Sequence, residues 1–104
     1  MGLYGIYGSH TTESCPLNNK EIRRLVIEGG PQIKQLAEKD NVKIIGQYHS
    51  GLEHTFLWVV EAKDAHTVES LMFKAKVHKF NAVTIVPLNT FDGVIEKCKQ
   101  IENS

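Results

Sequence analysis

The chain has 104 residues, of which 41% are hydrophobic and 23% are charged, a composition typical of a folded globular domain rather than a disordered segment. Lysine plus arginine and aspartate plus glutamate number 12 each, so the formal net charge is zero. This balance argues against a nucleic-acid-binding protein, which normally carries a basic excess or a basic stripe. We therefore expect a single domain over residues 1–104 that has no nucleic-acid partner.

No membrane or secretory segment is expected. The amino terminus lacks a basic stretch followed by an apolar run, and the longest strongly apolar run, Phe56 to Val60, is too short to cross a bilayer. A cytoplasmic protein without a membrane partner is therefore predicted. In a reducing compartment we expect Cys15 and Cys98 to be free thiols or metal ligands rather than a disulfide.

The first half of the chain predicts a strand, a broken helix and a second strand. The first strand covers Leu3 to Ser9. A helix begins near Asn18, with Glu21 as its capping-box partner. The sequence Gly29-Gly30-Pro31 breaks this helix, and the proline is well placed as the first residue of a second helical piece. The second strand covers Val42 to His49.

The second half predicts a hairpin, a helix, a strand and a last helix. The strand His54 to Ala62 follows a short hairpin loop, and Asp64 is a good N-cap for the next helix. The final strand, Ala82 to Val86, is expected to end at Pro87. Asn89-Thr90 then starts a C-terminal helix. The apolar positions of this helix share one stripe: Phe91, Val94, Ile95, Cys98 and Ile101.

The order β-α-β-β-α-β followed by a helix is the split βαβ, or ferredoxin-like, arrangement of the α+β class. Right-handed crossovers predict a four-stranded antiparallel sheet in which the first and third strands are central and both helices cover one face. The third strand is apolar on both sides, because Phe56, Trp58 and Val60 alternate with Leu57 and Val59. We expect a homodimer in which two open sheet faces stack; the alternative is that the C-terminal helix folds across this face.

Possible ligands gather where the first strand ends. The segment His10-Thr11-Thr12-Glu13-Ser14-Cys15-Pro16 places an imidazole, a carboxylate and a thiol within six positions. In the predicted topology the end of the first strand lies beside the starts of the third and fourth strands, and the hairpin brings in the end of the second. The side chains expected at this edge are His10, His49, His54 and His78, with Cys15 and Glu13 in the adjoining loop.

This clustering predicts a transition-metal site in a binding protein or a metal-dependent enzyme. Imidazole suits zinc, copper, nickel and iron, whereas a thiolate favours zinc or copper. In order of preference the ligands are His10 and His54, then Cys15 and His49, and then Glu13 and His78. An open position would suit a catalytic or transport site, and four protein ligands a structural one. The simpler interpretations are that Cys15 is a buried small hydrophobe and that His49 and His54 are polar hairpin residues.

Two other functions fit the same residues. In a haem-handling enzyme or a cofactor-free oxygenase, a histidine would be an axial ligand or a general base beside an aromatic pocket. The residues of that pocket would be Tyr4, Tyr48, Phe56 and Trp58. In a thiol-redox or sensor module, Cys15 just before a helix start would be a reactive thiol. No catalytic triad pattern, phosphate-binding glycine loop or dinucleotide fingerprint is present.

With the segment His10–Pro16, of the form H-x-x-E-x-C-P, and the pair Phe80-Asn81 before the last strand, the chain resembles a family of small, uncharacterised prokaryotic ferredoxin-like proteins. It is more distantly similar to nickel-binding ferredoxin-like proteins and to dimeric α+β barrels, which include haem-degrading and cofactor-free monooxygenases. The resemblance implies a dimeric α+β barrel with a site between sheet and helices. Fold analogy of this kind does not define the chemistry.

Overall fold

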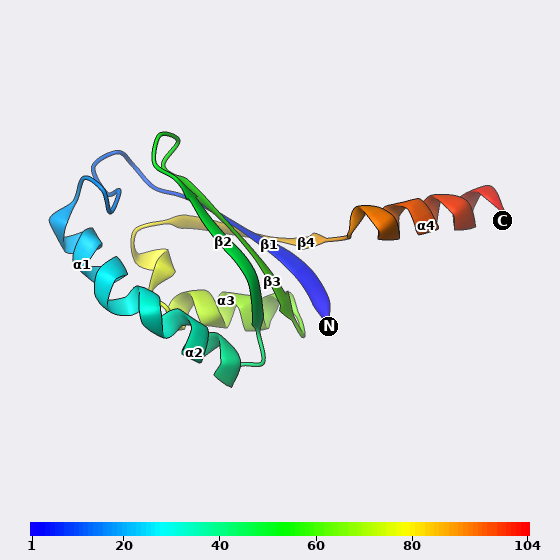
Figure 1. Cartoon of the computed structure of the whole chain (residues 1–104), viewed down its shortest axis with the longest axis horizontal. Helices are drawn as coiled ribbons and strands as arrows, with labels where there is room; N and C mark the ends of the chain where they lie inside the picture. Colours follow the sequence, from blue (N-terminus) through cyan, green and yellow to red (C-terminus); the bar gives the residue numbers. More distant parts are fainter.

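The strands and helices follow one another in the predicted order. The computed structural model describes all residues of the chain, 1–104. A four-stranded antiparallel sheet and an added C-terminal helix confirm the ferredoxin-like βαββαβ fold (Figure 1). The strands are β1 (Gly2–Ser9), β2 (Lys43–Ser50), β3 (Thr55–Ala62) and β4 (Ala82–Leu88). The α-helices are α1 (Lys20–Gly29), α2 (Ile33–Lys39), α3 (Ala65–Lys74) and α4 (Phe91–Glu102), and short 3₁₀ helices cover Gly30–Gln32 and Val77–Lys79.

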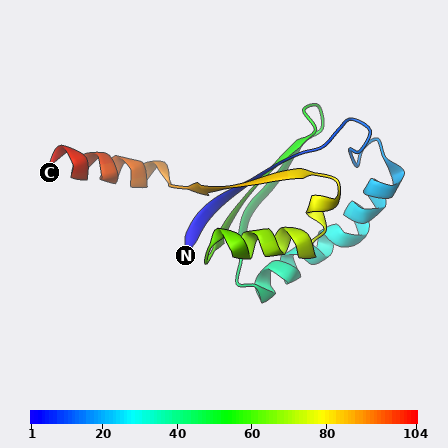
Figure 2. The same cartoon turned by 180° about the vertical axis from the view of Figure 1, so that it is seen from behind.

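The sheet has the order β2-β3-β1-β4, so β1 and β3 are central as predicted. Partners in an antiparallel ladder share a face of the sheet, and the register therefore assigns each strand residue to one of two faces. Gly8 pairs with Phe56, and Ile6 pairs with Trp58 and with Ile85. This face is covered by α1, α2 and α3, which lie on the same side of the sheet in both views (Figure 1, Figure 2).

The core lies between the central strands and α3. Ile6 and Val60 of the sheet and Val68 and Leu71 of α3 have no exposed surface. The two helix positions are three residues apart, the spacing that places side chains on one face. By contrast, α1 has no buried residue. The helix layer is therefore held on the sheet mainly by α3, with α1 at its margin.

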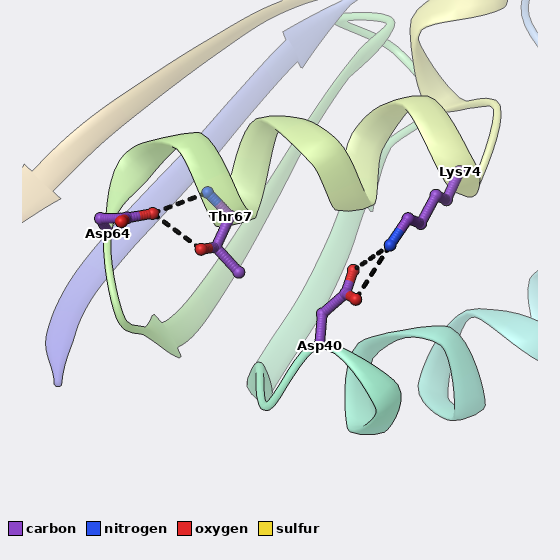
Figure 3. A network of polar contacts seen from close by, with 4 residues as sticks. All are labelled: Asp40, Asp64, Thr67 and Lys74. Atoms are coloured by element: carbon purple, nitrogen blue, oxygen red, sulfur yellow. Dashed lines mark hydrogen bonds and ion pairs between the residues drawn. The ribbon is translucent and has the colours of Figure 1, made fainter.

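Two polar contacts fasten the ends of α3 (Figure 3). At its start, the carboxylate of Asp64 accepts hydrogen bonds from the backbone N–H of Thr67 at 2.8 Å and from its hydroxyl at 2.7 Å. The hydroxyl and backbone hydrogen bonds of Thr67 lower the pKa of Asp64. At the other end, Lys74 donates to Asp40 at 2.9 Å and so ties α3 to the end of α2. The predicted N-cap is confirmed.

Two local predictions are wrong. Asn19 caps α1 by accepting from the backbone N–H of Ile22 at 3.0 Å, so Ile22 and not Glu21 stands at the capping-box position. Pro87 does not end the last strand, because β4 continues to Leu88. The continuation is possible since β4 is an edge strand, where a residue without a backbone N–H need not break the ladder.

The sheet face opposite the helices is uncovered within the chain. Its side chains include Tyr7 and Tyr48, whose exposed fractions are 44% and 64%. The alternative in which the C-terminal helix folds across this face is wrong, because α4 extends away from the sheet (Figure 1, Figure 2). The backbone stays extended through Thr90, the N-cap of α4, and carries the helix past the end of β4. The stacked homodimer stays a prediction. None of the helices has the length and apolar character needed to span a membrane.

We predict that Gly8→Ala destabilises the fold. A Cβ at position 8 would lie 2.0 Å from a ring carbon of Phe56, which is packed in the core. The ring must move, and overpacking of this kind costs about 1–3 kcal/mol of unfolding free energy. Urea unfolding checks this, with Gly29→Ala as the control because a Cβ there meets nothing within 4 Å. The control should be neutral or slightly stabilising. Equal midpoints for both variants would contradict the packing described.

Candidate metal centre

Three side chains from separate parts of the sequence meet at one end of the sheet. Possible ligand atoms of His10, Cys15 and His54 all lie within 4.8 Å of one another. His10 follows β1, Cys15 lies in the loop that leads to α1, and His54 precedes β3. The backbone N–H of His10 donates to the carbonyl of His54 at 3.0 Å. The pairing of β1 with β3 therefore continues one step beyond the strand ends and brings the two imidazoles together.

The orientation of the His10 ring is set by Asn81. The side-chain amide N–H of Asn81 donates to the carbonyl of Val77 at 3.0 Å, which leaves its oxygen facing His10. That oxygen lies 2.8 Å from Nδ1 of His10, so Nδ1 carries the ring proton and donates it. Nε2 of His10 then has a free lone pair, and it is buried without a hydrogen-bond partner. A histidine held through its second nitrogen in this way is typical of metal ligands.

His54 occupies an unusual backbone conformation. Its φ is 56°, in the left-handed region that glycine adopts without strain. Its backbone N–H donates to the carbonyl of Ser50 at 3.0 Å and closes the hairpin loop. The ring nitrogen Nδ1 is buried and, like Nε2 of His10, has no hydrogen-bond partner. A residue in a strained backbone conformation whose ring nitrogen is buried and unpaired is a feature of functional sites.

Cys15 is fully buried, with an exposed fraction of 0%. Its carbonyl accepts hydrogen bonds from the backbone N–H groups of Asn18 at 2.9 Å and Asn19 at 2.8 Å. Asn19 in turn caps α1. The turn that holds the thiol is therefore part of the helix start, and both Cys15 and the exposed Cys98 are free thiols.

His49 lies beside the three-residue group. Its ring stacks on that of His10, with centroids 5.4 Å apart and planes 4° from parallel. Partial burial lowers the pKa of His49, and the nearby rings of His10 and His54 lower it further. This imidazole therefore favours the neutral form. It forms an outer layer between the group and solvent.

Glu13 and His78 lie outside the group, contrary to the expectation that they would join it. Glu13 is exposed, and its backbone carbonyl accepts from the side chain of Asn19 at 3.1 Å. His78 packs on Phe73 of α3, with ring centroids 4.5 Å apart. The chain reverses between α3 and β4 at Lys76, whose φ is 60°, and the following 3₁₀ turn directs His78 to the helix.

A β-bulge in β2 decides which side chains face the site. Ile44 pairs with Val60 and Gly46 pairs with Val59, so Ile45 is an extra residue on β2. Because of the extra residue, every side chain of β2 after the bulge faces the other side of the sheet from the one that regular alternation would give it. His49 consequently lies on the helix face, paired with Phe56, and Tyr48 lies on the open face.

A cleft of about 580 Å³ adjoins the histidines between the sheet and the helices. Phe56 and Trp58 line it, and their rings are 5.4 Å apart. Tyr4 and Tyr48 do not line it, although we expected all four aromatic residues to share a pocket. The bulge turns Tyr48 away, and Tyr4 pairs with Val60 farther along the sheet.

Asn81 belongs to the site although neither its residue type nor its spacing marks it as a metal ligand. Ser9 pairs with Ala82, so continuing the antiparallel register by one step sets His10 opposite Asn81. The signal was present, since the pair Phe80-Asn81 directly precedes the last strand.

No model of a known protein family matches the chain, and no curated protein matches it. The function is therefore argued from the geometry of the site.

We predict that His54→Gly stabilises the chain when a chelator is present. Glycine relieves the left-handed strain and removes an unpaired buried nitrogen, so the free energy of unfolding should rise by about 1 kcal/mol. Lys76→Gly is the matched control, because Lys76 has a similar φ of 60° but no unpaired buried atom. Urea unfolding of both variants separates the backbone contribution from that of the imidazole. A loss of stability in His54→Gly alone would show that the imidazole is satisfied in the chelated chain.

Proposed function

We propose that this protein binds a transition-metal ion through Nε2 of His10, Sγ of Cys15 and Nδ1 of His54. One observation carries the proposal. The buried side-chain nitrogen and oxygen atoms without a hydrogen-bond partner are these two imidazole nitrogens, and both belong to the group that gathers around a buried thiol. Buried polar atoms are nearly always paired in folded proteins, so two orphans in one place call for a common partner.

A metal ion satisfies this arrangement better than a proton does. Leaving a buried donor or acceptor unpaired costs about 1–3 kcal/mol. The thiol proton of Cys15 could pair with one of the two nitrogens but not with both. An ion accepts both lone pairs together with the thiolate. The interpretation of Cys15 as a plain buried hydrophobe accounts for its complete burial but leaves the two ring nitrogens without a partner.

The donor set favours zinc or copper(I) over the other candidate metals. One thiolate and two imidazoles form a soft, mixed sulfur and nitrogen set, and no carboxylate belongs to the group. In a tetrahedral zinc site, bond lengths of about 2.0–2.3 Å imply ligand atoms roughly 3.5 Å apart. The ligand atoms are at most 4.8 Å apart, so binding would draw even the farthest pair together by only about 1 Å.

Three protein ligands leave a fourth coordination position. His49 stacks on His10 and also lines the cleft, as His10 does. We assign the fourth position to this side of the group, where it would be filled by a molecule from the cleft or, after a side-chain rotation, by His49. An open position is typical of catalytic and transport sites.

The thiol-redox alternative receives less support from the geometry. Reactive cysteines lie in partly exposed, electropositive surroundings, whereas Cys15 has no exposed surface. For the oxygenase alternative, Phe56 and Trp58 line the cleft as that function requires, but Tyr4 and Tyr48 do not. Metal binding explains the unpaired nitrogens, which neither alternative does.

The proposal predicts one tightly bound ion per chain. Elemental analysis after dialysis against zinc should give a stoichiometry of one, and cobalt(II) should produce a thiolate charge-transfer band that Cys15→Ser removes.

Asn81→Leu should weaken zinc binding by about 10–100-fold, because it frees the His10 ring from its hydrogen-bond partner. Zinc at 100 times its dissociation constant should raise the free energy of unfolding by about 2.7 kcal/mol.

His66→Ala and His78→Ala are the controls, since both histidines lie outside the group. They should bind zinc as the parent chain does. The proposal is wrong if the parent chain holds no zinc or copper after dialysis and its unfolding is unchanged by either metal. Equal zinc affinities in the parent chain and Cys15→Ser would also refute it.

A further inference from the structure

The cleft beside the histidines exists because α1 is held away from the sheet. Apolar side chains of α1 point across it, yet Leu25 and Val26 remain 36% and 42% exposed. Phe56 and Trp58 of β3 form the opposite wall. In both views α3 lies against the sheet, whereas α1 lies at its margin (Figure 1, Figure 2). Two apolar walls thus face a space of about 580 Å³, a size that suits a small organic ligand.

The polar groups of the cleft are unevenly placed. His10, His49 and Asn81 line it where it meets the candidate metal centre. Of its two lysines, Lys74 is already paired with Asp40 at 2.9 Å, and Lys76 is exposed to solvent. The lining also includes Gln32 and Glu28, and the exposed Glu28 carboxylate lies 3.8 Å from Arg24 on the same helix. A bound metal would therefore be the buried cation available to an anionic group in the cleft.

We propose that the cleft binds an apolar carboxylate, meaning an alkyl or aromatic carboxylic acid. Its hydrocarbon part fills the space between Leu25, Val26 and Trp58, and its carboxylate takes the fourth position on the metal beside His10. The hydrocarbon contact depends only on the cleft, while the choice of a carboxylate rests on the proposed metal site. Oxygen donors of carboxylates are ordinary zinc ligands, which makes this head group a fitting one.

The test uses Trp58, the single tryptophan of the chain, as a reporter inside the cleft. The full-length, zinc-loaded protein is titrated with decanoate and with 1-decanol while tryptophan emission is followed. Both probes should change the emission with one site per chain. Decanoate should bind about tenfold or more tightly than decanol, because its charged group reaches the metal.

Variants separate this inference from the metal proposal. Val26→Asp should abolish binding of both probes, whereas Ile27→Asp, on the exposed side of α1, should leave it unchanged. In Cys15→Ser, decanol should still bind and the preference for decanoate should be lost. No emission change with either probe would overturn the cleft site. A decanoate preference that survives in Cys15→Ser would overturn the assignment of the carboxylate to the metal.

A separate observation concerns α4 and the open sheet face. The apolar stripe of α4 is uncovered, with Phe91 and Ile101 exposed at 78% and 73%. The open sheet face is uncovered as well, and α4 does not lie on it, because the helix projects past the end of β4 (Figure 2). A chain with two apolar surfaces that it leaves unpaired is suited to pairing with a second copy.

Surface area supports the participation of α4. Four strands of about eight residues present a face of roughly 19 by 26 Å, or about 500 Å². A stable interface buries about 800 Å² of accessible surface on each partner, and the flat footprint of the sheet face, before the relief of its side chains is counted, is smaller than this. The 12-residue helix α4 adds a surface about 18 Å long and 10 Å wide. We propose that two copies associate through their open sheet faces, with α4 of each chain packed on the other.

Sedimentation equilibrium tests this arrangement. The parent chain should be dimeric at micromolar concentration, and Ile95→Asp, on the apolar stripe, should weaken the dimer by about tenfold or more. Gln100→Asp adds the same charge on the opposite side of α4 and should leave the dimer intact. Circular dichroism should show both variants folded, because α4 has no buried residue and packs on no other element extensively. A monomeric parent chain, or equal dimerisation of both variants, would overturn the proposal.

Discussion

The site depends on the antiparallel pairing of β1 with its two neighbours. The pairing of β1 with β3 and with β4 ends at Ser9, and the next residue, His10, contacts the residues that precede both of these neighbouring strands. On one side its backbone N–H bonds to the carbonyl of His54, and on the other its ring bonds to Asn81. A central strand is the only kind that can do this, because an edge strand has one neighbour. The topology therefore supplies both the second imidazole and the group that orients the first.

Gly8 and the bulge in β2 determine which side chains surround the candidate ligands. Gly8, two residues before His10, leaves space for the ring of Phe56, which approaches the backbone of β1 closely. The extra residue Ile45 shifts the alternation of β2 so that His49 stacks on His10. Both features act on the helix face of the sheet. They place an apolar surface and a third imidazole on the same side as the candidate ligands.

Much of the fold could be predicted from local patterns. The strand pattern from Leu3 to Ser9 predicted β1, and the capping residues Asp64 and Thr90 marked the starts of α3 and α4. The meeting of His10 with His54 followed from the topology, since antiparallel neighbours in the ferredoxin-like fold must bring those positions together. These features depend on short-range hydrogen bonds or on strand order, and both can be recognised in a single amino-acid sequence.

The other features of the site depend on contacts that no local sequence pattern indicates. The one-residue bulge after Ile44 has no distinctive sequence signal, and a regular alternation along β2 therefore puts Tyr48 on the helix face, whereas it lies on the open face. The reversal at Lys76 that removes His78 from the site has no glycine to mark it. The position of α1 depends on how the helix layer as a whole packs on the sheet. Its apolar stripe is present whether the helix lies on the sheet or stands beside a cleft.

In the proposed metal site, the complete burial of Cys15 bears on the kinetics of ion exchange. A competing ion could reach the thiolate only after the turn that joins β1 to α1 opens, and that turn is held by the hydrogen bonds of Asn18 and Asn19 to the Cys15 carbonyl. The transfer of the thiolate to a second ion would then follow local unfolding of the polypeptide rather than the lifetime of any one coordinate bond. Loading would be easiest while the chain is still folding, before the turn closes over the sulfur.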